Sequence, residues 1–161
     1  MFQKLSIIGV LVAAVIGFAA IVPATTASAE DGRDGTFLRG EGVLEARGDG
    51  LIAVKGRIDY DAHGDRAVLL VKDIAGDAEI DVQGVGDCSG EWNGFMLCFG
   101  TGEAHITGSD VAVILVGNNL GVHVEGKGWA YLKGRGYFKV NGHGPFPWNP
   151  DGGFAGVGEG N

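Results

Sequence analysis

The first residues that could carry chemistry lie in a short acidic segment. "DYDAHGD" places Asp59, Asp61, His63 and Asp65 at alternate positions, with a glycine sixth. A calcium loop opens in this way, with oxygen ligands at alternate positions and a glycine at position six. The glutamate that such a loop needs at position twelve is absent, because Leu70 stands there. We therefore expect no cofactor, with calcium at these four residues as the alternative.

A second group of residues could bind a sugar. In "GKGWAYLKGRGYFKVNG", residues 126–142, aromatic and basic side chains occupy odd-numbered positions. Aromatic rings can cover the apolar face of a sugar, while lysines donate hydrogen bonds to its hydroxyl groups. The candidate ligand-binding residues are Trp129, Tyr131, Lys133, Tyr137 and Lys139. The alternative is that the C-terminal segment "HGPFPWNP" covers the three rings.

Motifs for catalysis and for a transition metal are weak. Beyond residue 29 the chain holds only two serines, Ser89 and Ser109, and neither has a nucleophile-elbow sequence around it. No two of the four histidines have metal-ligand spacing in one segment, although His105 and His123 both occupy outward positions. Carboxylates are numerous, so a pair for hydrolysis is kept as an alternative. We expect a protein that is not an enzyme.

The elements that must position these residues share a glycine frame. Residues 40–56 and 126–142 both read Gly-x-Gly, five residues, Gly-x-Gly, five residues, Gly. Even-numbered positions are apolar or glycine, whereas odd-numbered positions are mostly charged or aromatic. This period of two is that of a β-strand, in which successive side chains point to opposite sides. We predict that even-numbered side chains face the core and that glycines mark bends.

These patterns predict an all-β fold of one domain, residues 37–144. The favoured architecture is a glycine-cornered β-solenoid or β-helix-like domain. A β-sandwich or a small barrel of bent strands is the alternative. Cys88 and Cys98 should form a disulfide, because an even cysteine count in an exported chain favours pairing.

Two segments are apolar at both odd and even positions. They are "AVLLV", residues 67–71, and "VAVILV", residues 111–116. If even-numbered side chains face inward, the outward ones are Leu69, Val71, Val113 and Leu115. Such residues need a cover. The cover would be another part of the chain or a second molecule, so these four are candidate interface residues.

The two ends of the chain suggest export. Residues 1–29 combine Lys4, an apolar run and the small residues Ala27-Ser28-Ala29, which predicts a cleaved signal peptide. An uncleaved anchor is the alternative, and we expect membrane contact only through that segment. Residues 30–36 should be a flexible mature N-terminus and residues 145–161 a tail rich in proline and glycine. The protein would then be secreted, periplasmic or displayed at the cell surface.

The net charge of the chain limits the classes of partner that it is expected to bind. The net charge is −8 for 161 residues, which argues against nucleic acid and against anionic lipid. We expect a non-catalytic structural or interaction module whose partner is itself, an extracellular glycan or another protein. A carbohydrate-binding module that uses the outward aromatics is the first alternative, and a carboxylate hydrolase is the second.

Overall fold

The computed structural model of the chain describes residues 35–148, so the predicted signal peptide lies outside the described residues. This part is all-β, as predicted, and contains no helix. Its strands form one antiparallel sheet that does not close on itself. No described helix is long and apolar enough to cross a membrane. The strands are β1 (Thr36–Asp73), β2 (Glu79–Gln83), β3 (Asp87–Trp92), β4 (Phe95–Val140) and β5 (His143–Pro147).

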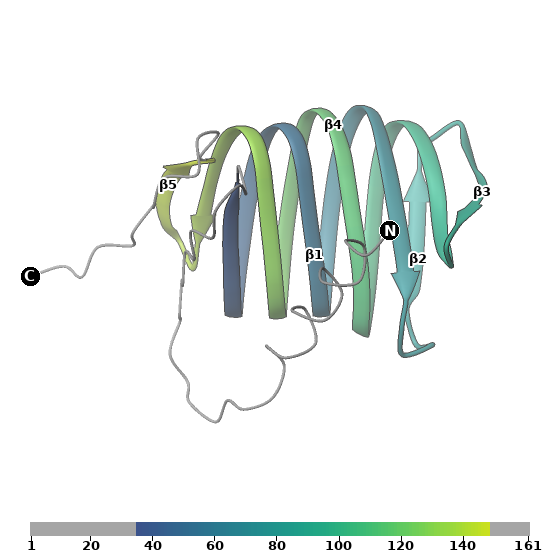
Figure 1. Cartoon of the computed structure of the whole chain (residues 1–161), viewed down its shortest axis with the longest axis horizontal. Coiled ribbons are helices and arrows are strands. Elements are labelled where there is room, and N and C mark those ends of the chain that lie inside the picture. The colour runs from purple at the N-terminus through teal and green to yellow at the C-terminus, as the bar shows by residue number, and fades with distance from the viewer. Residues whose placement is uncertain (1–34, 149–161) are drawn as a thin grey trace, which may run out of the picture.

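The two long strands, β1 and β4, are wound together, so that much of β1 lies between two passes of β4. Ile52 pairs with both Leu115 and Leu132, which belong to successive passes of β4. In Figure 1 the ribbons of β1 and β4 alternate along the long axis and arch over the molecule in successive turns. One turn of the winding therefore contains about as many residues as one copy of the glycine frame. Every pairing within residues 35–148 is antiparallel, unlike the pairing of a parallel β-helix.

The two copies of the glycine frame meet each other at the bends. Gly50 of the first copy pairs with Gly134 of the second. A Cβ atom on Gly50 would lie 2.2 Å from the carbonyl oxygen of Lys133, and one on Gly134 would lie 2.2 Å from that of Asp49. Both glycines have positive φ, 140° and 132°. The frame is repeated because each glycine makes room for its partner strand.

The core fills the inside of the winding, and even-numbered residues supply most of it. Ile52, Leu132 and Phe138 are all 2% exposed or less, which confirms the inward direction predicted for them. Tyr60 and Trp148 are buried with them. The odd-numbered neighbours of Ile52 and Leu132, by contrast, face away from this core.

The predicted outward direction of four apolar residues is wrong. Leu69, Val71, Val113 and Leu115 are 1–4% exposed and lie in the core. In β1 the alternation shifts by one residue near Arg66, whose φ is +49°. In β4 it shifts between Gly108 and Val111, because Ile58 pairs with Gly108 and Gly56 pairs with Val111. A single extra residue in a strand turns every following side chain to the other side. These four residues are therefore not available as an interface.

The ends of the sheet are held by local features. The predicted disulfide between Cys88 and Cys98 is present and joins β3 to β4. The sheet continues past residue 144, where the domain was expected to end, because β5 pairs with β4 as far as Pro147. Trp148 follows and donates its backbone N–H to the carbonyl oxygen of Gly136 at 2.9 Å. Of the expected C-terminal tail, residues 149–161 lie outside the described part.

Candidate functional site: a polar groove

The winding of β1 and β4 brings charged residues from distant parts of the sequence into two rows. Partners across neighbouring strands point to the same side of a sheet, so each row forms a continuous strip of surface. We call this surface the polar face. The first row is Asp81, His105, Asp61, His123, Glu45 and Lys139. The second row is Gln83, Glu103, His63, Gly121, Arg47 and Tyr137.

The polar face is hollowed into a groove of about 730 Å³, and both rows line it. Gly121 lies between His63 and Arg47 in the second row and carries no side chain. A Cβ at Gly121 would lie 2.0 Å from the His63 ring, so the ring occupies the space above this glycine. Pro145, from β5, lies at the end of the groove near Tyr137 and Lys139. The hollow is thus built from pairs of strands and depends on the register between them.

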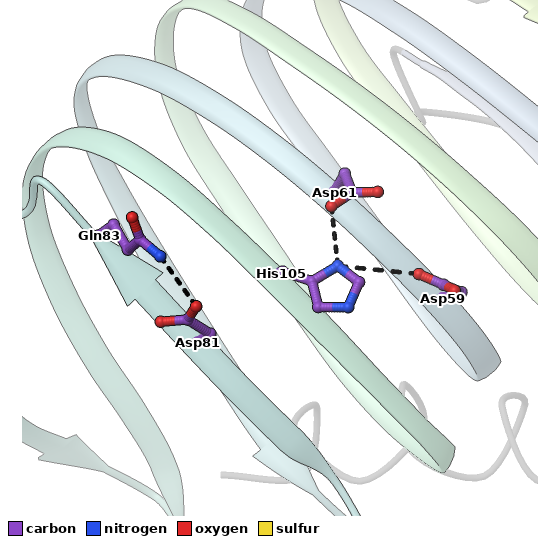
Figure 2. Close-up of polar contacts among 5 residues, drawn as sticks. All are labelled: Asp59, Asp61, Asp81, Gln83 and His105. Atoms are coloured by element: carbon purple, nitrogen blue, oxygen red, sulfur yellow. Dashed lines mark hydrogen bonds and ion pairs between the residues drawn. The ribbon is translucent and has the colours of Figure 1, made fainter.

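His105 stands at the centre of the acidic half of the groove. Its Nδ1 atom lies 2.8 Å from Asp61 Oδ1 and 3.9 Å from Asp59 Oδ1, as Figure 2 shows. Asp61 belongs to the neighbouring pass of β1, and Asp81 of β2 flanks His105 on the other side. The hydrogen bond to Asp61 raises the pKa of His105, with the negative charges of nearby carboxylates adding to the effect. Protonation of His105 is therefore favoured by its neighbours.

We predict that removing the Asp61 charge lowers the pKa of His105. In the wild-type protein the His105 titration should be centred above the ordinary value of about 6.5. Because the folded pKa is the higher one, His105 stabilises the fold below that value and the contribution is lost as pH rises through the folded pKa. Asp61→Asn should shift the titration to lower pH, as measured by the histidine ring resonances in NMR. An unchanged titration would show that the contact is not made in solution.

The groove as a whole offers both kinds of hydrogen-bonding group. Carboxylates of Glu45, Asp61, Asp81 and Glu103 can accept, while Arg47 and Lys139 can donate. His123 adds a longer contact, with its Nδ1 atom 3.8 Å from Glu45 Oε1. Such exposed pairs contribute only about 0–1 kcal/mol each to folding. These exposed pairs therefore add little to the stability of the fold.

The five residues predicted as one sugar platform lie on two different surfaces. Tyr137 and Lys139 are exposed on the polar face and line the groove. Trp129, Tyr131 and Lys133 precede the bend at Gly134 and pair with residues 51–55 of β1 instead. Trp129 is half-buried and stacks on Phe37, with 5.7 Å between the ring centroids. The single platform is therefore wrong, because a glycine bend separates its two halves.

The predicted calcium residues do not gather either. They follow one another along an extended strand, which spaces alternate side chains about 7 Å apart. His63 leans over Gly121, and Asp65 accepts a hydrogen bond from Asn119 Nδ2 at 3.0 Å. Asp59 and Asp61 gather with His105 instead, and their ligand atoms all lie within 4.8 Å of one another. In the described chain, these three exposed residues are the group that could hold a cation.

Most of the groove was not predicted from the sequence, although signals for it exist. Glu45, Arg47, Glu103 and His123 are odd-numbered, outward and polar, as the alternation indicates. What was missing is the register that puts them side by side. His105 and His123 flank the same residue, Asp61, because one turn of the winding separates them. Their spacing in the sequence, close to the length of the glycine frame, was the available signal.

Comparisons with known proteins identify no relative of this chain. No family model matches it, and neither a curated protein nor a solved structure does. The groove and its residues are thus the basis on which a function can be assigned.

Proposed function

We propose that this protein is an exported, non-catalytic interaction module that binds a neutral glycan chain in the groove of the polar face. The observation that carries the proposal is the 730 Å³ groove, lined along its length by acceptors and donors and ending at an exposed tyrosine. Sugar hydroxyl groups both donate and accept hydrogen bonds, so a lining of both kinds suits them. A strongly acidic or strongly basic polymer would meet side chains of its own charge in one half of the groove.

Tyr137 supplies the apolar contact that a sugar ring needs. Its side chain is 63% exposed, although it is a large aromatic residue. Across the strands it pairs with Arg47 on one side and Pro147 on the other, and Pro145 also lines this end of the groove. An exposed ring beside a guanidinium group can stack on the sugar while the cation reaches its hydroxyl groups.

The proposed function is non-catalytic because the groove carboxylates lie in water. A general acid for glycoside hydrolysis needs a raised pKa, which burial commonly provides. The side chain of Asp61 is 60% exposed and is paired with His105. The oxygens of Asp61 are open to water and can accept hydrogen bonds from a ligand.

We further propose that the wound pair of β1 and β4 acts as a glycine-cornered solenoid, a stiff support for the groove. The repeated pairing of glycines at the bends and the continuous apolar core favour this description. The disulfide between Cys88 and Cys98 is compatible with a role outside the cytoplasm. Secretion, the periplasm and the cell surface all fit this proposal.

Tyr137→Ala is expected to abolish retention on immobilised glycans. The ring contributes its stacking area to the ligand and nothing to the core, so affinity should fall about tenfold or more at unchanged stability. The measurement is affinity electrophoresis against a panel of neutral polysaccharides, with circular dichroism and thermal unfolding as the test of folding.

Trp129→Ala is the matched control, because Trp129 lies beyond the glycine bend and outside the groove. It should leave glycan retention unchanged. Loss of retention in Trp129→Ala together with normal retention in Tyr137→Ala would show that the glycan binds outside the groove. That result would contradict the proposal. Failure of the wild-type protein to bind any of the polysaccharides would also contradict it.

A further inference from the structure

A second surface, on the stretches of β1 and β4 beyond the glycine bends, has the opposite character. Its residues alternate with the buried core residues of the same strands, so their side chains point outward. The small side chain of Ala53 is itself buried, 9% exposed. We call this surface the apolar face. One row across it is Phe37, Tyr131, Ala53, Ile114, Leu70 and Leu97. The adjacent row is Lys133, Leu51, Val116, Val68 and Phe99.

The apolar face corrects the earlier prediction of an interface. An apolar outward strip does exist on the segments "AVLLV" and "VAVILV", but it is formed by the other residues of each strand, such as Leu70 and Ile114. Large side chains on it remain in contact with water: Phe99 is 48% exposed, and Trp92 on the adjoining strand β3 is 59% exposed. A contiguous apolar surface of this kind marks an interaction site.

Basic residues accompany the apolar side chains. The third row of this surface is Arg39, Trp129, Lys55, Ala112 and Lys72, and Lys133 ends the row of Leu51. Lys72 lies over the ring of Phe95, with Nζ 5.5 Å from its centroid. Within these three rows of described residues, every charged side chain is a cation. Asp110 lies beside this surface, with its Oδ1 atom 4.0 Å from Lys55 Nζ. Many of the other acidic groups that give the chain its net charge of −8 lie on the polar face.

We infer that the apolar face binds peripherally to the surface of an anionic lipid bilayer. Apolar side chains would enter the region between headgroups and acyl chains, and the rings of Trp129 and Trp92 suit that boundary. Long lysine and arginine side chains can bury their stems beside apolar groups and extend their charges to lipid phosphates. This partner was not expected from the net charge, because the two signs are segregated on different surfaces.

Charge complementarity favours lipid over a second copy of the chain. Two apolar faces stacked on each other would bring lysines and an arginine of both molecules into one desolvated interface. Stacking on the polar face of a second copy would pair the charges but would bury apolar side chains against a hydrated groove. A phospholipid surface provides negative phosphates and apolar chains together, and so satisfies both groups.

The test is co-sedimentation of the full chain with vesicles of phosphatidylcholine alone or of phosphatidylcholine mixed with phosphatidylglycerol. The quantity measured is the ratio of the two partition coefficients, and it is compared between variants that carry the same N-terminal segment. Wild-type protein should favour the anionic vesicles, and Lys55→Glu/Lys72→Glu should lower the ratio at least tenfold. Arg47→Glu/Lys139→Glu makes the same charge change on the polar face and should leave the ratio nearly unchanged.

Three results would overturn the inference. One is an equal partition of the wild-type protein between the two kinds of vesicle. Another is an equal loss in both charge-reversal variants, which would reflect net charge alone. The third is a stable dimer in light scattering that Leu70→Gln dissociates, because a second copy would then occupy the face. Glycan retention is measured separately and depends on Tyr137. The glycan proposal and the lipid inference can therefore each be contradicted without affecting the other.

Discussion

Gly50→Ala is expected to destabilise the protein by about 3 kcal/mol or more, and Gly134→Ala to do the same. The added methyl group would lie 2.2 Å from a backbone carbonyl oxygen in each case, and that oxygen belongs to the partner strand rather than to a flexible side chain. Each residue would also have to hold a φ that L side chains rarely adopt. The steric clash and the unfavourable φ both raise the free energy of the folded state, because moving the strand to relieve the clash would break its pairing.

Urea unfolding followed by circular dichroism measures this effect. Gly86→Ala is the matched control, because a Cβ there would meet its nearest atom at 3.9 Å, an ordinary contact. Its unfolding midpoint should stay close to that of the wild-type protein. If Gly50→Ala and Gly86→Ala unfold at the same urea concentration, the strands are not in contact at this bend.

Val113→Asp is expected to prevent folding, whereas Ile114→Asp should give a folded protein. Val113 is 1% exposed and lies in the core, so a carboxylate there would be buried without a partner, at a cost of at least about 4 kcal/mol. Ile114 is the next residue and points outward on the apolar face. Substituting an outward residue costs far less, since the new charge stays in water.

Expression level and thermal unfolding of this pair test the shifted alternation directly. The even-inward pattern of the glycine frames would lead to the reverse result, because Ile114 carries an even number. A folded Val113→Asp protein together with an unfolded Ile114→Asp protein would mean that the register shift is absent.

The parts of the fold that could be predicted are those that depend on local alternation. Ile52, Leu132 and Phe138 were placed correctly because nothing interrupts the period of two between the glycines around them. Leu69 and Val113 were not, because each follows a register shift, near Arg66 in β1 and between Gly108 and Val111 in β4. Arg66 takes a positive φ that its side chain does not favour, and only the surrounding pairing reveals it.

The site was harder to predict than the strands, because it depends on which strands are neighbours. Tyr137 and Trp129 are close in the sequence, yet the glycine bend sends one to the groove and the other to the apolar face. His105 and Glu45 are far apart in the sequence, yet only Asp61 and His123 separate them in one row. Register between distant segments is set by the whole winding, which single-strand patterns do not contain.

The central claim is that the groove of the polar face holds a glycan. The most direct measurement is a titration of ¹⁵N-labelled protein with the best oligosaccharide from the affinity screen, followed by backbone amide shifts in NMR. We predict that the largest shifts occur at Arg47, Gly121 and Tyr137, which line the groove. Shifts confined to Trp129 and Tyr131, with the groove amides unmoved, would contradict the account.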